Sequence, residues 1–440
     1  MTRLLKGGRV IDPAQGLDGA CDVLIENGRI AAVGRGLASG TAAVVEVPHG
    51  LVICPGFIDM HVHLREPGQE HKETIETGTA AAAAGGFTAV ACMPNTAPIN
   101  DNASVTRFIR DRAAESGVVR VYPIGAVTKG SKGEQLAEIG ELNQAGCVAV
   151  SDDGRPVASA MMMRRALEYA GMFGMPVIDH CEEPTLKGEG VAHEGHVAAV
   201  LGLRGIPAAA EDVMVERDVV LAEAFGGRVH IAHLSTRGAL RAVRAAKARG
   251  VRVTCEVTPH HLVLCDDALM GPKSYDTNLK MNPPLREAAD RDALVGGLAD
   301  GSVDAIATDH APHHADEKHV EFDRAPFGIA GLETAVSLLV DRVVHAGVIT
   351  LARLVELWSV NPARILQVPG GTLAVGAQAD LTILAPDLAV TVTPDRFRSK
   401  ARNTPFGGWT LRGGVAATIV GGRAVYVNPE APGAGAFAIE

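Results

Sequence analysis

Residues 57–63 read Phe-Ile-Asp-Met-His-Val-His, an apolar stretch with polar, metal-type side chains at every second position. Side chains two residues apart leave a β-strand on the same face, so Asp59, His61 and His63 are expected to point the same way. Two imidazoles on one face can bind one divalent metal ion. The alternative is that each histidine is an ordinary buried residue with a satisfied hydrogen bond.

Later apolar stretches end in the same kinds of residue. They span residues 149–153, 177–180, 229–233 and 305–309, and they end in Asp152-Asp153, His180, His233 and Asp309. Independent core residues would not be expected to collect at strand ends in this way. The repetition therefore favours a shared metal site over a set of unrelated buried histidines.

The middle of the chain alternates between strand-like and helix-like segments. Strand candidates lie near 57–63, 87–93, 120–127, 147–153, 176–182, 228–235, 252–258 and 305–309. Helix-like stretches separate them, for example 73–84, 158–173 and 332–345. Eight strands that alternate with helices predict an α/β protein with a (β/α)₈ TIM barrel over residues 53–366, whose active site lies at the carboxyl ends of the strands.

Both ends of the chain are rich in short strand-like segments. In residues 1–52, Asn27-Gly28 separates two such segments and is typical of a tight hairpin turn. Residues 367–440 contain further strand candidates at 379–384 and 416–422. Because neither end has enough strands to bury a face alone, we expect residues 1–52 and 367–440 to form one small, β-sandwich-like domain.

The bulk composition excludes several classes of partner. Lys and Arg total 41 against 51 Asp and Glu, a net charge of −10 that argues against nucleic acid and acidic membranes as partners. The seven cysteines form no C-x-x-C pair, the N-terminus has no apolar stretch of signal-peptide length, and no apolar run elsewhere could span a bilayer. We therefore expect a cytoplasmic protein that acts on a small molecule.

Four motifs together resemble one enzyme family. They are the segments 55–68 (Pro-Gly-Phe-Ile-Asp-Met-His-Val-His-Leu-Arg-Glu-Pro-Gly), 93–96 (Met-Pro-Asn-Thr), 282–286 (Asn-Pro-Pro-Leu-Arg) and 307–313 (Ala-Thr-Asp-His-Ala-Pro-His). Through these four motifs the chain resembles the bacterial class I dihydroorotases of the amidohydrolase superfamily. The resemblance covers nearly the whole length, and residues 371–381 resemble the composite β domain of that superfamily.

The fourth strand departs from the wider superfamily. Many relatives, hydantoinases and allantoinases among them, place a carboxylated lysine between two metals there, whereas residues 151–154 of this chain read Ser-Asp-Asp-Gly. The resemblance to class I dihydroorotases implies that Asp153 takes the bridging place. Asp152 is expected to face away because adjacent strand residues point to opposite sides. The alternative is a plain acidic turn before Gly154.

The resemblance implies a reaction and a metal. It implies the reversible, zinc-dependent cyclisation of N-carbamoyl-L-aspartate to L-dihydroorotate in pyrimidine (UMP) biosynthesis, with two Zn²⁺ ions per subunit. The donor set of nitrogen and oxygen without thiolate suits catalytic zinc. The implied metal ligands are His61, His63, Asp153, His180, His233 and Asp309. Asp309 is also the expected catalytic residue, which takes a proton from the attacking water and passes it to the ring nitrogen.

Further residues are candidates for binding the substrate. Arg65 lies two residues beyond His63, and its planar fork suits a carboxylate; the alternative is a structural salt bridge with Glu66 or another neighbour. Asn95 and His313 match family positions that bind the same carboxylate. The ring is expected to contact Asn282, Phe327 and Gly328, and for Asn282 a turn role beside two prolines is the alternative.

Other histidines and one aspartate are expected to play supporting roles. His260 and His261 follow a strand, but the metal set is already complete, so we expect them to be structural or to support the ligands. His310 is expected to point away from the metals. Asp59 is expected to orient a ligand rather than bind metal.

Two other functions compete with dihydroorotase. Another cyclic-amide hydrolase, a hydantoinase or an allantoinase, is the nearest alternative, and Arg65 and the missing lysine argue against it. A non-catalytic dihydroorotase-like subunit of aspartate transcarbamoylase would be expected to lose metal ligands, whereas this chain keeps them. The resemblance also implies a homodimer and leaves open an association with aspartate transcarbamoylase. The polar loops 184–196 and 310–328 could close over a substrate.

Overall fold

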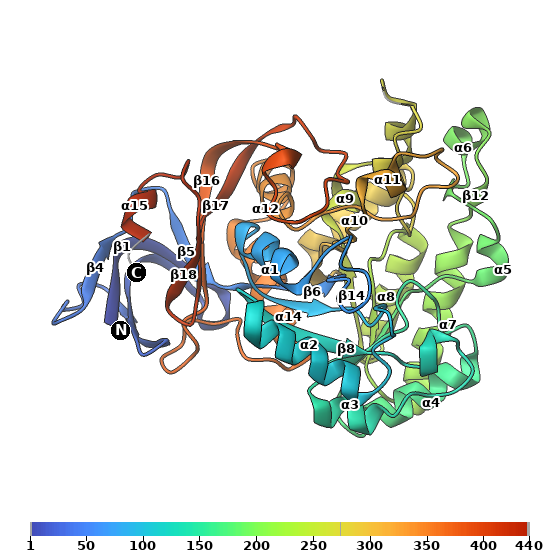
Figure 1. Cartoon of the computed structure of the whole chain (residues 1–440), viewed down its shortest axis with the longest axis horizontal. Coiled ribbons are helices and arrows are strands. Elements are labelled where there is room, and N and C mark those ends of the chain that lie inside the picture. Colours follow the sequence, from blue (N-terminus) through green and yellow to red (C-terminus); the bar gives the residue numbers. More distant parts are fainter. Residues whose placement is uncertain (1, 273, 438–440) are drawn as a thin grey trace.

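The chain forms a barrel of parallel strands and, beside it, a sheet built from both ends of the chain (Figure 1). The computed structural model describes residues 2–272 and 274–437. The outermost ends of the predicted terminal domain, residue 1 and residues 438–440, lie outside this range.

The barrel contains the eight predicted strands, and all eight are confirmed. They are β6 (Phe57–Val62), β7 (Phe87–Cys92), β8 (Arg120–Gly125), β9 (Ala149–Val150), β10 (Val177–Asp179), β13 (Val229–Ile231), β14 (Val253–Val257) and β15 (Ala305–Ile306). Neighbouring strands are parallel throughout. A bridge between Val62 and His310, with the His63 amide 2.9 Å from the His310 carbonyl oxygen, joins the last segment to the first. The carboxyl ends of the strands therefore meet around one rim.

Helices pack around the outside of the barrel. The longer ones are α1 (Ile75–Ala84), α2 (Ala103–Ser116), α3 (Ile139–Ala145), α4 (Ala160–Gly171), α7 (Ala209–Phe225), α8 (Arg237–Ala248) and α10 (Ala288–Asp300). The predicted helix at 332–345 is α12 (Ala335–Leu339), which continues as a π-helical turn, η5 (Val340–Val344). Their apolar faces and the outward side chains of the strands form one large buried cluster.

Short elements complete the chain. They are α5 (Pro184–Lys187), β11 (Ala192–His193), α6 (His196–Leu201), β12 (Gly205–Ile206), α9 (Pro259–Val263), α11 (Ala315–Lys318), α13 (Leu351–Val355), η6 (Glu356–Val360), α14 (Asn361–Leu366) and α15 (Ala434–Phe437). Single 3₁₀ turns lie at Pro13–Gln15, Lys129–Ser131, Asp266–Met270, Thr277–Leu279 and Pro394–Arg396. None of the described helices is both long and apolar enough to cross a bilayer.

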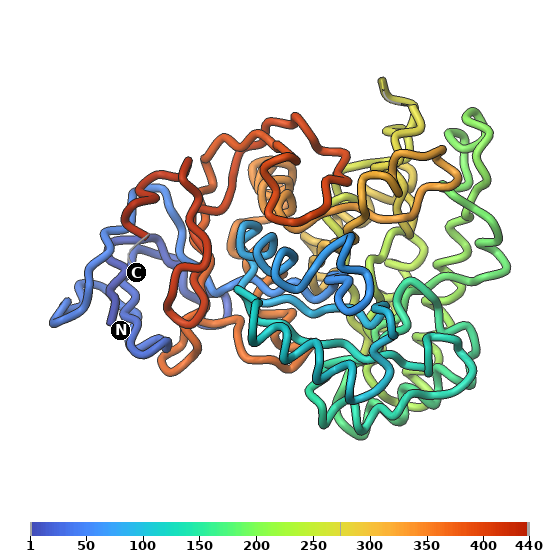
Figure 2. Tube along the Cα trace, in the orientation of Figure 1, coloured from blue at the N-terminus to red at the C-terminus, as the bar shows by residue number. Residues whose placement is uncertain are grey.

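The sheet beside the barrel combines strands from both chain ends, as predicted. Its strands are β1 (Thr2–Asp12), β2 (Leu17–Glu26), β3 (Arg29–Gly34), β4 (Ala43–Glu46), β5 (Val52–Pro55), β16 (Leu381–Thr391), β17 (Thr410–Val420) and β18 (Arg423–Val427). β5 pairs in parallel with β1 and antiparallel with β16, and so joins the two ends (Figure 2). The predicted hairpin turn is also confirmed, with Asn27 and Gly28 at φ values of 50° and 75°. The domain boundaries themselves stay a prediction.

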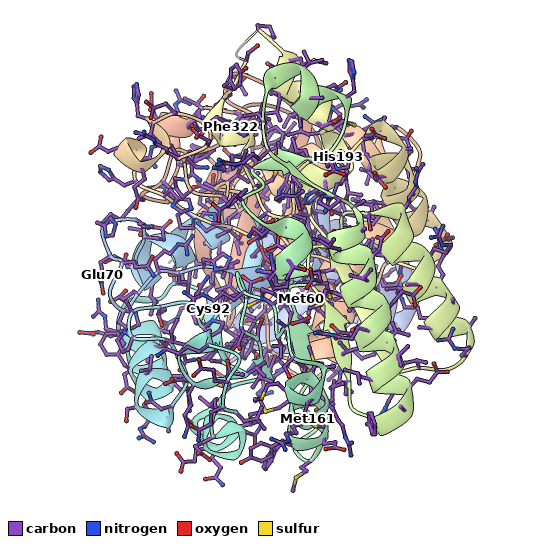
Figure 3. The ribbon with its side chains drawn as sticks, turned by 90° about the vertical axis from the view of Figure 1, so that its right-hand side faces the viewer. Met60, Glu70, Cys92, Met161, His193 and Phe322 are labelled. Carbon is purple, nitrogen blue, oxygen red and sulfur yellow. The ribbon has the colours of Figure 1, made fainter. Side chains whose placement is uncertain are left out.

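The first barrel strand is less regular than its sequence suggests. Between Asp59 and Val62 the register against β7 shifts, with three steps on β6 opposite two on β7, which is a β-bulge. Met60, near the centre of the molecule in Figure 3, belongs to the apolar cluster inside the barrel, while Val62 packs outward against the helices. The expected strict alternation of Asp59, His61 and His63 is therefore wrong, because one extra residue separates Asp59 from the two histidines.

Candidate metal centre and active site

All six side chains singled out by the sequence as metal ligands lie together and are buried at the carboxyl ends of the barrel strands. His61 and His63 end β6, and the others follow β9, β10, β13 and β15. The six residues are His61, His63, Asp153, His180, His233 and Asp309. Segments separated by up to about 250 residues of chain thus supply one compact cluster.

One half of the cluster is formed by the two histidines of the first strand. The Nε2 atom of His63 lies 3.0 Å from Oδ1 of Asp309 and 3.5 Å from Oδ2 of Asp153. The Nε2 atom of His61 lies 3.4 Å from the same Asp153 oxygen and 3.5 Å from Oδ1 of Asp309. Four potential ligand atoms therefore face a common centre.

The other half is formed by the histidines that follow β10 and β13. Nδ1 of His180 and Nε2 of His233 are 2.8 Å apart. Oδ1 of Asp153 lies 3.6 Å from the first of these nitrogens and 3.3 Å from the second. Asp153 consequently presents one carboxylate oxygen to each pair of histidines.

Hydrogen bonds on the far side of the rings indicate that the cluster fits a cation. Glu256 accepts from Nδ1 of His61 at 2.7 Å, and the side-chain amide oxygen Oδ1 of Asn95 lies 2.9 Å from Nδ1 of His63. With a proton on each Nδ1, both Nε2 atoms turn lone pairs toward carboxylate oxygens. Nε2 of His61 is buried and forms no hydrogen bond. Facing acceptors of this kind need a positive charge between them, and nitrogen and oxygen donors suit a divalent metal.

The titration behaviour of the cluster agrees with this excess of acceptors. Burial lowers the pKa of His61, but Asp153, Asp309 and Glu256 outweigh it, so the pKa is well above the ordinary value. For Asp309, burial raises the pKa, but His61 and His63 outweigh it and hold the carboxyl below its usual range. The carboxylates therefore stay ionised and available as ligands.

Glu256 was not anticipated from the sequence. It is fully buried on β14, and its second oxygen lies 3.2 Å from Nε2 of His230, whose Nδ1 lies 2.8 Å from the Thr254 hydroxyl. Burial raises the pKa of Glu256, but His61 and His230 outweigh it and lower the pKa to about 2. The available signal was an acidic residue inside the apolar run 253–257. Its contact with Nδ1 fixes the orientation and tautomer of His61.

Replacing Glu256 by Gln is expected to weaken binding of Zn²⁺ by about 10- to 100-fold, because the amide no longer fixes the proton on Nδ1 of His61. Competition with a chromophoric chelator measures this affinity. Glu223→Gln, which removes an exposed partner of Arg249 on α7, serves as the control and should bind the metal as the parent does. Equal affinities in all three proteins would rule out this role for Glu256.

Two neighbours of the cluster have other partners. Asp152 accepts from the amides of Val127 and Thr128 at 2.9 and 3.0 Å, so its carboxylate faces away from the histidines as expected. Asp59 accepts from the Thr308 hydroxyl at 2.5 Å and from the His61 amide at 3.1 Å. It holds the backbone around the site.

Of the other histidines near the rim, His261 and His310 have hydrogen-bond partners, whereas the buried Nε2 of His260 has none among the described residues. His261 lies 2.7 Å from the Thr258 hydroxyl and 3.0 Å from the Pro283 carbonyl oxygen. His260 is buried, which lowers its pKa to about 4. His310 lies 3.3 Å from Glu73 and so points away from the cluster, as expected.

The residues with expected substrate contacts surround the same rim. The Asn282 amide lies 3.1 Å from Nε2 of His180, so Asn95 and Asn282 each contact a histidine of the cluster. Nε2 of His313 donates to the Phe327 carbonyl oxygen at 2.8 Å, and this bond connects the two ends of the loop over residues 310–328. Gly328 follows with a φ of 127°, a conformation that a side chain would strain.

Arg65 is a buried cation with an incomplete set of partners. Its side chain donates one hydrogen bond, from Nε to the Pro312 carbonyl oxygen at 3.3 Å, and it forms no salt bridge among the described residues. The expected alternative, a salt bridge with Glu66, is absent from this structure because Glu66 pairs with Arg112 at 2.9 Å. Burial lowers the pKa of Arg65 to about 10, so the guanidinium remains charged. It is free to bind an anion.

Backbone strain also collects at this rim. Arg65, His233 and Asp309 have φ values of 63°, 30° and 47°, a region that residues other than glycine rarely adopt. Each such residue costs on the order of 1–3 kcal/mol, and strain of this kind gathers at functional sites.

Asn403, from the segment between β16 and β17, also reaches the loop and was not anticipated. Its Nδ2 donates to the carbonyl oxygens of Ala311 and Gly328 at 3.1 Å each, and its Oδ1 accepts from the His313 amide. One side chain thus holds three points of the loop. No local sequence signal marks it, because its partners lie about 75–92 residues earlier.

The fold resembles that of solved hydantoinases. L-Hydantoinase (dihydropyrimidinase) from Arthrobacter aurescens has a TM-score of 0.87 and 24% sequence identity, with 96% of each chain covered. D-Hydantoinase (dihydropyrimidinase) from a Thermus species has a TM-score of 0.82 and 26% identity, with 97% of this chain and 96% of that chain covered. The barrel and its buried cluster define a metal-dependent cyclic amidohydrolase.

Comparison with known sequences shows which family of cyclic amidohydrolases the chain is similar to. Residues 50–239 match the family described as Dihydro-orotase-like. A protein named dihydroorotase from Pelotomaculum thermopropionicum is 58% identical over 97% of this chain and 98% of its own length, and one from Geobacter metallireducens is 55% identical over 97% and 100%. The chain belongs to the dihydroorotase family.

Proposed function

We propose that the chain is a class I dihydroorotase of the amidohydrolase superfamily, which interconverts N-carbamoyl-L-aspartate and L-dihydroorotate in pyrimidine biosynthesis. The observation that carries the proposal is the buried Arg65 guanidinium, unpaired by any carboxylate in the described chain, beside a cluster of metal-type ligands. A cyclic amide that carries a carboxylate suits this combination.

The metal site is proposed to hold two Zn²⁺ ions. His61, His63 and Asp309 would hold one ion and His180 and His233 the other, with Asp153 between them. When bound, zinc polarises a carbonyl group and lowers the pKa of water to about 7. The shared carboxylate of Asp153 is supported by its position, with one oxygen toward each histidine pair.

Asp309 is proposed as the catalytic proton carrier. Its carboxylate is ionised, because His61 and His63 lower its pKa against the effect of burial. It takes the proton of the attacking water and delivers it to the ring nitrogen as the carbon–nitrogen bond breaks. In the direction of ring closure the same carboxylate removes the proton from the carbamoyl nitrogen.

The surrounding polar groups are proposed to bind and orient the substrate. Arg65, Asn95 and His313 would bind its carboxylate, while Asn282 and the backbone of Phe327 and Gly328 would contact the ring. His313 is suited to a neutral role, because burial and the neighbouring Arg65 lower its pKa to about 2. A neutral imidazole carries a single N–H, so His313 would bind the substrate carboxylate only by releasing the Phe327 carbonyl oxygen.

The proposed reaction is tested by offering the zinc-loaded protein dihydroorotate, hydantoin and allantoin in parallel. We expect kcat/KM for dihydroorotate to exceed the values for the other two by at least about a hundredfold, since only dihydroorotate carries the carboxylate that Arg65 would bind. A preference for hydantoin or allantoin would overturn the substrate assignment.

Replacing Arg65 by Met is expected to raise KM for dihydroorotate by about 10- to 100-fold, the value of a charge-assisted hydrogen bond. Steady-state kinetics measure the change. Arg112→Met, which removes the partner of Glu66 on α2, should leave KM within about twofold of the parent. An unchanged KM in Arg65→Met would contradict the proposed contact.

Three further properties are proposed on the family resemblance. They are a homodimer, an association with aspartate transcarbamoylase and a cytoplasmic location. The seven cysteines are all unpaired, as expected in a reducing compartment. Light scattering of the protein alone, and with aspartate transcarbamoylase added, tests the first two.

A further inference from the structure

Two buried lysines, one in the loop 310–328 and one outside it, bind backbone groups close to Phe327 and Gly328. Lys280 and Lys318 are 2% and 7% exposed. Neither pairs with a carboxylate in the described part of the chain, although burying an ammonium group without a counter-ion is costly. The catalytic chemistry proposed above uses neither of them.

Lys318 ties together two segments of the rim. Its Nζ donates to the carbonyl oxygens of Thr277, Lys280 and Pro326 at 3.0, 3.4 and 2.8 Å. An ammonium group has three donors, so all of them are used. The Thr277 hydroxyl in turn donates to the Lys318 carbonyl oxygen at 2.6 Å. The segment that leads to Asn282 is thereby fixed to the residue before Phe327.

Lys280 binds the other part of the same loop. Its Nζ donates to the carbonyl oxygens of Phe322 and Asp323 at 2.8 and 3.0 Å, and it lies 4.7 Å from the centre of the Phe327 ring. Its own carbonyl oxygen accepts from the Gly328 amide at 2.9 Å. Figure 3 places Phe322 near the end of the molecule opposite Met161 on α4. The side chain of Lys280 thus binds the start of residues 322–328, and its backbone binds the end of that segment.

These contacts act on backbone groups that need a defined conformation. A Cβ atom at Gly328 would lie 2.6 Å from Cβ of Ala311, and the Phe327 carbonyl oxygen is already bound by His313. Three of the five carbonyl oxygens that the two ammonium groups bind belong to this loop, those of Phe322, Asp323 and Pro326, so loss of an ammonium would leave these acceptors without that partner. The loop would then be expected to shift.

The lysines also place positive charge close to the substrate loop. Nζ of Lys187, which pairs with Glu182 at 2.7 Å, lies 5.5 Å from the centre of the Phe327 ring, so two ammonium groups approach that ring. Burial is the main reason that the pKa values of Lys280 and Lys318 fall to about 8 and 7.

We propose that Lys280 and Lys318 are positioning residues that hold the Phe327–Gly328 backbone and the Asn282 segment in the conformation that binds an anionic cyclic amide. The proposal deepens the proposed function and rests on it for the identity of the substrate. It predicts an effect on KM that is larger than the effect on kcat.

The test uses Lys318→Met and Lys280→Met in the full-length, zinc-loaded protein. Methionine keeps the length of the side chain and removes its charge and donors. We expect KM for dihydroorotate to rise at least about tenfold with kcat within about threefold, and the zinc content to stay at the parent value. Lys247→Met is the control, since Lys247 binds the Ser302 carbonyl oxygen at 2.6 Å and pairs with Asp304 at 2.6 Å before β15, at the opposite ends of the strands. Its KM should not change.

Hydrogen exchange of residues 319–328, followed by mass spectrometry, keeps the test independent of substrate identity. We expect faster exchange in both variants than in the parent and in Lys247→Met. Folded variants with parental KM and parental exchange would overturn the proposal. Faster exchange in a protein that does not turn over dihydroorotate would retain the positioning role and reject the proposed substrate.

A milder variant covers the case in which Lys318→Met does not fold. Lys318→Arg keeps the charge but replaces the compact ammonium by a planar group that cannot meet the same three oxygens. A smaller rise in KM together with faster exchange supports the proposal, and parental values of both overturn it.

Discussion

Asp309→Asn is expected to lower kcat for dihydroorotate hydrolysis by about 100- to 10,000-fold, the contribution of a general acid–base group. The carboxylate lies 3.0 Å from Nε2 of His63 and is kept ionised by the histidines around it. An amide oxygen can still contact a metal ion, but the amide cannot accept and return a proton. Zinc content should therefore stay close to the parent value.

Two measurements separate this role from a structural one. Zinc per chain is determined by plasma mass spectrometry, and turnover is determined at saturating substrate. Asp316→Asn, at an exposed side chain on α11 in the loop that follows, is the control and should leave both values unchanged. Normal turnover in Asp309→Asn would refute the assignment.

Asp153→Asn is expected to reduce zinc content below half of the parent value and to abolish turnover. Asp153 offers one oxygen to His61 and His63 and the other to His180 and His233, so its charge acts on both halves of the cluster. A neutral amide removes that charge and one oxygen ligand. The stabilisation that bound metal gives the fold should fall with the affinity.

The neighbouring residue gives a matched control. Asp152 directly precedes Asp153 and is also buried, but its carboxylate binds the amides of Val127 and Thr128. Asp152→Asn should lose about 1–3 kcal/mol of unfolding free energy, since it weakens hydrogen bonds to buried groups, while the zinc content stays high. If instead Asp152→Asn lost the metal and Asp153→Asn retained it, the assignment of the bridging residue would be reversed.

The strand pattern was sufficient to predict the fold. Alternating apolar runs and helices predicted the barrel and its eight strands, and the Asn27-Gly28 turn predicted the hairpin of the terminal sheet. The β-bulge at 59–62 could not be read in advance, because a bulge depends on how β6 pairs with β7. For this reason the expected face of Asp59 was wrong.

The sequence was less informative about groups that support the site. The six ligand-type residues stood out because each ends an apolar run, and the structure brings them together. Glu256 and Asn403 act through hydrogen bonds to distant segments of the chain. Lys280 and Lys318 bind backbone carbonyl oxygens, which every residue has, so the sequence does not show which of them are bound. Such contacts depend on tertiary structure rather than on local pattern.

Anomalous diffraction from a crystal of the zinc-loaded protein, recorded at the zinc edge, tests the central claim most directly. We expect two strong peaks, one among His61, His63 and Asp309 and one beside His180 and His233, with Asp153 between them. Peaks elsewhere, or none at this rim of the barrel, would contradict that claim.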